Sequence, residues 1–316
     1  MGRYCNSGAS AERAERIASS CSELTNESTQ VVLRDRDRDA VIKATCKPIW
    51  HFTSGVRLST THMLGIQLDR FNTYNLWEQD EERWWGQAID TVNRQQLCST
   101  PKDGCAVLDV GAALGYYTIM SRLRLPAGVA VHAFNPHWIF MSTLRQNLML
   151  NQQDGSVCLH EQAVSNTSGD LIRFGFGHAA GLGVRGHRVG SRSMATVQTT
   201  TLDEWARQHL SEQRPPFLLV KIDVEGAADL VLQAATKLIG VASHFVIGIH
   251  SNQELDAVQR AIGPPAYEVL KARARGSQSS PNGEFVARLG SWQAEHPAQR
   301  HQGLKKRMVS KDTRRT

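Results

Sequence analysis

The feature that most constrains this chain is a short apolar run that ends in an acid and leads into a turn of small residues. Residues 105–109 read Cys-Ala-Val-Leu-Asp, residues 111–115 read Gly-Ala-Ala-Leu-Gly, and a helix can begin at Tyr116. This order predicts a buried strand, a glycine loop and a helix, whose first amides can meet an anionic group. A dinucleotide fingerprint would require a further glycine, and a Walker phosphate loop would require a GK[ST] sequence, so neither is present. The loop predicts a site for a nucleotide-like ligand.

The alternation of strands and helices continues along the chain. Apolar runs typical of buried strands recur at residues 129–134, 157–164, 217–222 and 245–249. Apolar residues at helical spacing lie between them, and Thr201-Leu-Asp-Glu204 has the spacing of a capping box. Strands that alternate with helices predict an α/β fold with a largely parallel sheet and helices on both faces. Ligands of such sheets bind beyond the carboxyl ends of the strands, so residues just after each strand are the candidates for the site.

The chain divides by composition into four parts. We expect a loosely ordered N-terminal extension at residues 1–48, a helical lead-in at 49–104, the main domain at 105–290 and a basic tail at 291–316. In the lead-in, residues 76–95 predict an amphipathic helix. Within the main domain, residues 175–190 form a glycine-rich loop, for which a mobile lid and an ordinary surface loop are both open interpretations. The apolar face expected for the amphipathic helix consists of Leu76, Trp84, Ala88, Ile89 and Val92.

The positive charge of the chain is concentrated at its end. The formal net charge is +6, and the segment from Arg300 to Thr316 carries seven Lys or Arg against a single acid, Asp312. The remainder is therefore neutral, which predicts a solvated basic tail and no specific nucleic-acid partner. Weak contact of the tail with nucleic acid or an anionic membrane is the alternative. The sequence gives no indication of an oligomeric state.

The six cysteines, at positions 5, 21, 46, 98, 105 and 158, show no CxxC pair or zinc-finger spacing. We expect free thiols in a reducing compartment. No segment approaches the roughly 20 apolar residues of a membrane span, and the first thirty residues lack the apolar stretch of a signal peptide. A cytoplasmic protein without a transmembrane segment is the resulting expectation.

Five segments carry motifs in a recognisable order, namely LDVGAALGYYT, VHAFNPHWIFMSTLRQNLMLN, EQAVSNTSGD, TTTLDEWARQH and LVKIDVEGAADLVLQA. In content and order they resemble the FkbM family of methyltransferases, over roughly residues 105–250, and the KIDVEG block is the most specific. The resemblance implies a Rossmann-like class I methyltransferase fold with a seven-stranded, mostly parallel sheet. It also implies S-adenosylmethionine as methyl donor and an oxygen acceptor, commonly a hydroxyl of a sugar or another small molecule.

The resemblance also implies roles for individual residues of this sequence. Asp223 and Glu225 follow the fourth strand, where the donor sulfonium and the acceptor would meet, and one of them would orient the acceptor or take its proton. His250 is a second candidate base, although a capping or packing role is equally open. No metal is required. The residues implied in donor binding are Asp109, Gly111 and Gly115 on the methionine side, Asn135 beside the ribose, and Glu161 or Gln162 at the adenine edge.

Four positions depart from the family pattern. Ala113 replaces the usual Asn, and Asn135, Ala228 and Gly248 each replace a usual Glu. An amide at position 135 can still bond a ribose hydroxyl but lacks the charge-assisted pair of a carboxylate, a difference of about 1–2 kcal/mol. The leading hypothesis is an O-methyltransferase that acts by direct displacement. The alternatives are a catalytically impaired binding protein with the same fold and, more remotely, an NAD-type oxidoreductase.

Overall fold

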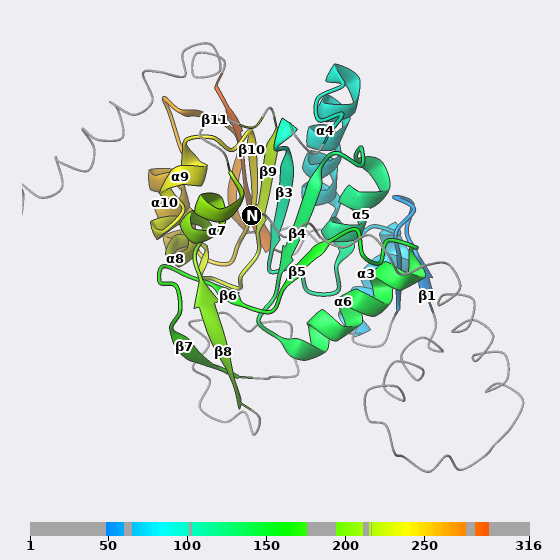
Figure 1. The fold of residues 1–316 in the computed structure, drawn as a ribbon. Coiled ribbons are helices and arrows are strands. Elements are labelled where there is room, and N and C mark those ends of the chain that lie inside the picture. The colour runs from blue at the N-terminus through cyan, green and yellow to red at the C-terminus, as the bar shows by residue number, and fades with distance from the viewer. Residues whose placement is uncertain are drawn as a thin grey trace, which may run out of the picture.

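The computed structural model describes residues 49–59, 65–100, 103–175, 194–210, 215, 217–275 and 282–290. These residues form an α/β fold around a seven-stranded sheet with the strand order β11-β12-β10-β9-β3-β4-β5 (Figure 1). The expected extension at 1–48 and the basic tail at 291–316 lie outside the described residues. Within the described ranges, no helix combines the length and apolar character that crossing a bilayer requires.

The sheet is parallel except at one strand. β12 is antiparallel to both of its neighbours, whereas β10, β9, β3, β4 and β5 pair in parallel. The strand order reverses between β3 and β9, so the segments after these two strands meet at the topological switch point. The strands are β3 (Ala106–Val110), β4 (Ala130–Phe134), β5 (Cys158–His160), β9 (Leu218–Ile222), β10 (His244–Ile249), β11 (Tyr267–Arg275) and β12 (Asn282–Leu289).

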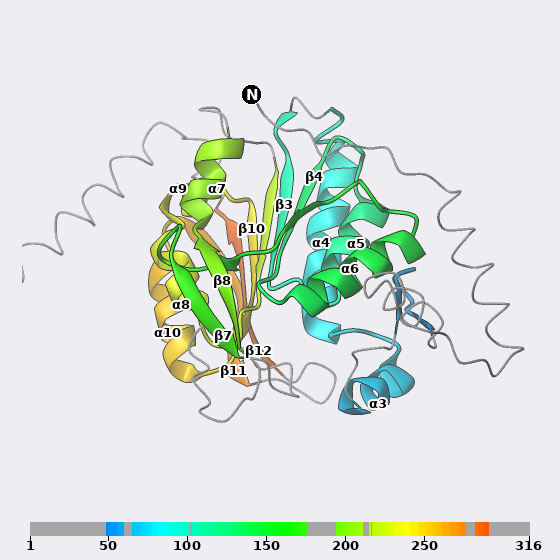
Figure 2. The ribbon, with the colours of Figure 1, turned by 60° about the horizontal axis from the view of Figure 1, so that its bottom comes forward.

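Helices cover both faces of the sheet, as predicted (Figure 2). Successive residues of the central strands serve opposite faces, because side chains alternate across a strand. Val107 of β3 packs on one side with α4, α5 and α6, and its neighbour Leu108 packs on the other side with α7, α8, α9 and α10. The helices are α4 (Gln79–Gln95), α5 (Tyr116–Arg124), α6 (Trp138–Leu150), α7 (Leu202–His209), α8 (Ala228–Gln233), α9 (Thr236–Ile239) and α10 (Asn252–Ala261).

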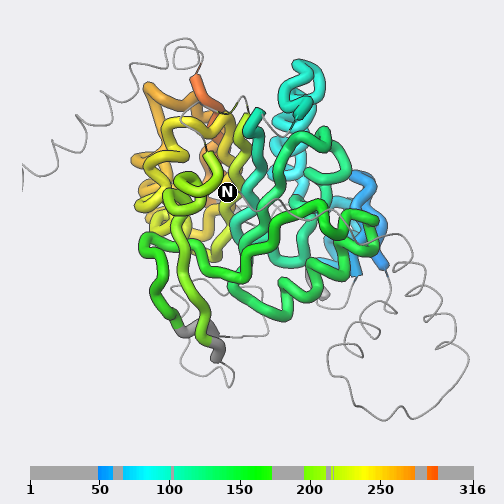
Figure 3. Tube along the Cα trace, in the orientation of Figure 1, coloured from blue at the N-terminus to red at the C-terminus, as the bar shows by residue number. Residues whose placement is uncertain are grey.

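The lead-in is only partly helical. It begins with a small hairpin of β1 (Ile49–His51) and β2 (Arg57–Ser59), which precedes α3 (Gly65–Tyr74) and α4. The hairpin lies beside α6, although the two elements are far apart in the sequence (Figure 3). Two asparagines connect them, Asn147 within α6 and Asn151 directly after its end. Asn147 Oδ1 accepts the N–H of Ser59, and Asn151 Oδ1 accepts the N–H of Arg57, both at 2.9 Å.

The buried face of α4 differs from the predicted face. The helix begins at Gln79, so Leu76 lies before it and is only partly buried, whereas Glu81, Glu82 and Gly86 belong to the buried face. Trp85 is fully buried, with its indole N–H donated to Ser121 Oγ at 3.0 Å, and Trp84 is only partly buried. Ala88, Ile89 and Val92 are buried as predicted. Adjacent helix positions differ by about 100° around the axis, so neighbouring tryptophans point in different directions. The sequence alone did not show which of the two belongs to the buried face.

The predicted third strand is two strands that belong to different sheets. β5 joins the main sheet, while β6 (Ala163–Val164) pairs with β8 (Met194–Thr200) in a three-stranded sheet completed by β7 (Leu171–Gly175). Most of the glycine-rich loop falls outside the described residues, so neither interpretation of it is tested. The capping box is half formed: Thr201 Oγ1 accepts the N–H of Glu204 at 3.0 Å.

The expectation of free thiols is wrong for the described cysteines. Cys98 and Cys105 form a disulfide, and Cys158 is disulfide-bonded as well. The first pair ties the segment after α4 to the start of β3. Because disulfides persist in oxidising compartments and are rare in the cytosol, this finding argues against the cytoplasmic expectation.

A group of histidines lies between β4, β5 and α7. The indole N–H of Trp205 donates to Nδ1 of His132 at 3.1 Å, and Nε2 of His160 lies 3.0 Å from the same nitrogen. His160 stacks on Phe134 at a ring separation of 4.2 Å. A ring nitrogen that receives an N–H cannot also hold a proton, so these contacts keep His132 neutral.

Candidate active site

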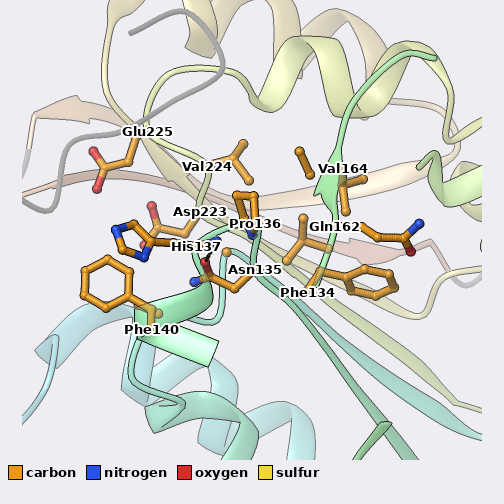
Figure 4. Close-up of a pocket in the computed structure, with 14 residues that line it drawn as sticks. Phe134, Asn135, Pro136, His137, Phe140, Gln162, Val164, Asp223, Val224 and Glu225 are labelled. Atoms are coloured by element: carbon orange, nitrogen blue, oxygen red, sulfur yellow. Dashed lines mark hydrogen bonds between the residues drawn. The ribbon is translucent and has the colours of Figure 1, made fainter. Parts of the chain in front are cut away.

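The candidate site is a pocket at the carboxyl ends of the parallel strands. Its walls come from the loop after β3, the turn from β4 into α6, the segment after β5 and the turn after β9 (residues 223–225). In Figure 4 the carboxylates of Asp223 and Glu225 lie on one side, and Phe134, Gln162 and Val164 lie on the other. The pocket therefore has an acidic end and a largely apolar end at the switch point of the sheet.

The glycine loop forms the floor of this pocket. Gly111 has a φ of +88°, and a Cβ at this position would lie 1.9 Å from the carbonyl oxygen of Asp223. Its N–H and that of Ala112 both donate to the carbonyl of Phe134, at 2.9 and 3.1 Å. Only glycine satisfies both the left-handed backbone and the close approach. The loops after β3, β4 and β9 are thus held together by backbone contacts.

The turn after β4 uses its polar side chains to start α6. Asn135 Oδ1 accepts the N–H of His137 at 2.8 Å, and Nδ1 of His137 accepts the N–H of Ile139 at 3.2 Å. His137 therefore caps the helix and carries any proton of its neutral ring on Nε2. Asn135 lines the pocket, but its oxygen is already committed to the turn.

The acidic end is a network of opposite charges. Nε2 of His250 lies 3.3 Å from Glu225 Oε2 and 3.5 Å from Asp223 Oδ1. On the far side of Asp223, Lys221 Nζ lies 3.0 Å from Oδ2. The three residues predicted for catalysis, Asp223, Glu225 and His250, are therefore brought together.

The pKa values in this network follow from the partners. Burial alone would lower the pKa of His250, but the proximity of Glu225, Glu254 and Asp223 outweighs it and raises the pKa to about 11. Burial alone would raise the pKa of Asp223, but the charges of Lys221 and His250 hold it below its usual range. At neutral pH the His250 ring is therefore protonated on both nitrogens and positively charged, and the Asp223 carboxylate is ionised.

A group of carboxylates lies behind Asp223. Ligand oxygens of Glu78, Glu81 and Asp223 come within 4.8 Å of one another, a spacing that a metal ion could use. Lys221, however, already places its ammonium 3.6 Å from Glu81 and 3.0 Å from Asp223, and 4.7 Å from the centre of the Tyr117 ring. We therefore interpret Asp223 as the counter-charge of this buried lysine. Burial, with the neighbouring carboxylates, raises the pKa of Glu78 and of Glu81 and so favours their protonated forms.

Three of the six predicted donor-binding residues line the pocket: Gly111, Asn135 and Gln162. Asp109 is buried in β3 and accepts the hydroxyl of Thr118 at 2.6 Å, and burial raises its pKa. Gly115 caps α5, where a Cβ would lie 2.0 Å from Leu144 Cδ1.

Glu161 forms a half-exposed ion pair with Arg145 at 3.5 Å and does not line the pocket. Sequence reasoning missed His137, Phe140 and Val164, which do line it. The sequence showed only that Asn135-Pro136 ends the strand, and it did not show which later side chains reach the pocket.

Sheet order and pocket together define the class of the protein, a Rossmann-like α/β fold with its site at the switch point, as predicted from the resemblance. Residues 109–262 match the family model described as the methyltransferase FkbM domain. The chain thus carries a methyltransferase domain of the FkbM family, and this prediction is confirmed.

Solved structures of methyltransferases resemble the chain at low sequence identity. An rRNA methylase from Streptococcus thermophilus has 12% identity and a TM-score of 0.38, with 64% of this chain and 94% of that chain covered. An O-methyltransferase from Bacillus cereus in complex with SAH has 11% identity and a TM-score of 0.38, with 88% and 100% covered. No curated protein matches the chain by sequence. The family assignment rests on the match of residues 109–262.

Proposed function

We propose that the protein transfers a methyl group from S-adenosylmethionine to a hydroxyl of a sugar or another small molecule. The observation that carries the proposal is a pocket with two carboxylates, Asp223 and Glu225, at one end and an apolar wall at the other, inside the FkbM domain. This division suits a ligand with a cationic centre and a flat, weakly polar ring.

The pocket residues fit such a donor. Gly111 and Ala113 leave room for the backbone of the loop to approach the methionine part, and Phe134 and Val164 offer apolar contacts to the adenine. Gln162 supplies an amide at that same side. The donor itself would supply an electrophilic methyl group on a cationic sulfur, which the acidic end of the pocket favours electrostatically.

Among the acidic residues, Glu225 is the best candidate to orient the acceptor hydroxyl or take its proton. Its side chain is one-third exposed at the pocket, whereas Asp223 is committed to Lys221 and His250. His250 holds a proton at neutral pH, so it suits the role of a charged partner better than that of a base. Alignment of the two reactants would provide most of the acceleration.

A second candidate function is a binding protein that has lost catalysis. One observation favours it: Asn135 stands where the family places an acid, and its oxygen accepts the N–H of His137. Its amide group then has N–H donors to offer a ribose and no charged acceptor, which would weaken donor binding.

Calorimetric titration with S-adenosylmethionine and, separately, S-adenosylhomocysteine tests the proposal without knowledge of the acceptor. We expect saturable one-to-one binding, and about tenfold tighter binding by Asn135→Asp, since a carboxylate restores the charge-assisted bond. Asn252→Asp, an exposed change on α10, is the matched control and should bind like the wild type. No binding by the folded wild type at millimolar ligand would favour the non-catalytic alternative.

If the donor binds, Glu225→Gln should reduce turnover with any accepted hydroxyl substrate and leave the fold intact. Unchanged turnover in both Glu225→Gln and Asp223→Asn would remove the proposed role of this turn.

A further inference from the structure

Glu254 is a buried acid of α10 that lies behind the candidate site and was not among the predicted site residues. It is only 2% exposed, and its two oxygens accept backbone N–H groups from different elements. Oε1 accepts the N–H of Ala228, the first residue of α8, at 2.9 Å, and Oε2 accepts the N–H of His250 at 2.7 Å. A single carboxylate thus joins α10, the start of α8 and the end of β10.

The local sequence explains how Glu254 reaches this position. Ser251 is the N-cap of α10, and its hydroxyl accepts the N–H of Glu254 at 3.1 Å. In a full capping box the glutamate would return to the N–H of the cap residue itself. Here the carboxylate bonds the N–H of the preceding residue, His250, and so reaches the site.

The imidazole of His250 has a carboxylate on each side. Its Nδ1 lies 3.6 Å from Glu254 Oε2, while Nε2 faces Glu225 at 3.3 Å and Asp223 at 3.5 Å. A neutral imidazole has one N–H, so one of its nitrogens would turn a lone pair toward a carboxylate. A ring protonated on both nitrogens matches all three neighbours.

The backbone of the turn that carries Glu225 has an unfavourable conformation. Glu225 has a φ of +53° and Gly226 a φ of +87°, and the left-handed region is unfavourable for a residue with a Cβ. The contact with Nε2 of His250 therefore holds a side chain whose backbone is not in a relaxed conformation.

We propose that Glu254 is a positioning residue of this site: it fixes the His250 ring as a cation with carboxylates on both sides, and the ring orients the Glu225 carboxylate at the pocket. The catalytic consequence rests on the function proposed above, whereas the state of the ring does not. Glu254 touches neither donor nor acceptor and acts through His250.

The electrostatics of the ring agree with this geometry. The charged groups that face it are Asp223 and Glu225 from the turn after β9 and Glu254 from α10, with Lys221 of β9 behind Asp223. Their combined effect outweighs burial and raises the pKa of His250 to about 11. Loss of one carboxylate should lower that pKa by about 1–3 units.

Nitrogen NMR of labelled histidine rings, in the full chain without ligand, tests the proposal directly. The resonances of His250 are identified by their loss in His250→Gln. In the wild type we expect both ring nitrogens to be protonated at neutral pH, and in Glu254→Gln a pKa lowered by about 1–3 units. The substituted amide retains an oxygen for one of the two backbone N–H groups. Asp256→Asn, an exposed change on the same helix, is the matched control and should leave the ring unchanged.

A neutral His250 ring in the wild type, or an equal pKa of His250 in Glu254→Gln and the wild type, would overturn the proposal. With an accepted substrate, Glu254→Gln should lower kcat and leave the KM for the donor unchanged, and unaltered kcat would overturn the positioning role. Because the NMR measurement needs no donor, absence of donor binding would count against the proposed function alone.

Discussion

Two regions of the molecule bury histidines and give them opposite charge states. At the candidate site, His250 is bracketed by carboxylates, and its pKa is raised to about 11. Beside α7, burial and the nearby His209 lower the pKa of His160 to about 4, and burial with both other rings holds the pKa of His132 well below its usual range. Burial acts in the same direction in both regions, so the charge of the neighbours decides the outcome.

The two regions should therefore respond to pH in opposite directions. For His160 the folded pKa lies below the unfolded value, so its contribution to stability is complete above about pH 6.5 and is lost as the pH falls toward about 4. For His250 the folded pKa lies above the unfolded value, so its contribution is complete below about pH 6.5 and is lost as the pH rises toward about 11. Near neutral pH, therefore, the contribution of His160 to stability is complete and the loss of the contribution of His250 begins.

The largest effect is expected from Lys221→Met, which removes a buried cation from the acidic region. Asp223 would then lack its nearest counter-charge, and the free energy of unfolding at neutral pH should fall by about 3–5 kcal/mol. Lys237→Met, at an exposed position of α9, should change it by no more than about 0.5 kcal/mol. Urea denaturation measures both. A loss below about 1 kcal/mol would mean that Asp223 is not held as an ion by Lys221.

A smaller effect is expected from His160→Gln in the neutral region. A pKa difference of one unit corresponds to about 1.4 kcal/mol, so the wild type should lose a few kcal/mol between pH 6.5 and 4 through this ring. The variant should lose about 2 kcal/mol less over that range, measured as the slope of unfolding free energy against pH. His51→Gln, at an exposed position, serves as the control. Equal slopes in His160→Gln and the wild type would show that His160 already titrates normally.

The smallest substitution is Gly248→Ala, which adds a single methyl group and tests how tightly the acidic region is packed. A Cβ at position 248 would lie 2.8 Å from Asp223 Oδ1, so the aspartate must shift and the protein should lose about 1–3 kcal/mol. The pKa of His250 should fall as Asp223 moves. In Gly290→Ala the nearest atom lies 3.6 Å away, and neither quantity should change. Unaltered stability and an unaltered His250 ring in Gly248→Ala would mean that Asp223 has room to move.

The sequence was sufficient for the central strands and for part of the site. β3, β4, β9 and β10 are continuous apolar runs because parallel strands are buried on both faces, and such runs are readable without tertiary information. Gly111 and Asp223 were placed at the pocket because each directly follows one of these strands. The two strands at one end of the sheet, β11 and β12, were not predicted. Their charges, such as Arg273, are matched by the neighbouring strand, here Glu284 at 3.2 Å, and only the fold reveals that pairing.

The parts of the structure that sequence reasoning could not supply depend on contacts between distant elements. Asp109 is predicted at the donor, and its carboxylate accepts the hydroxyl of Thr118 of α5. The disulfide between Cys98 and Cys105 could not be inferred, because spacing alone does not fix which cysteines meet. Gly248 was interpreted as a lost acid, yet its missing side chain leaves the space that Asp223 occupies.

The contact between Gly111 and Asp223 makes two turns of the site one mechanical body. The carbonyl of Asp223 stands where a Cβ of Gly111 would be, so main chain lies against main chain with no side chain between to absorb movement. Under the proposed function, one turn receives the donor and the other faces the acceptor. A displacement of either turn by a few tenths of an ångström is therefore transmitted to the other. Binding of the donor would then shift the turn that faces the acceptor, and binding of the acceptor would shift the turn that receives the donor.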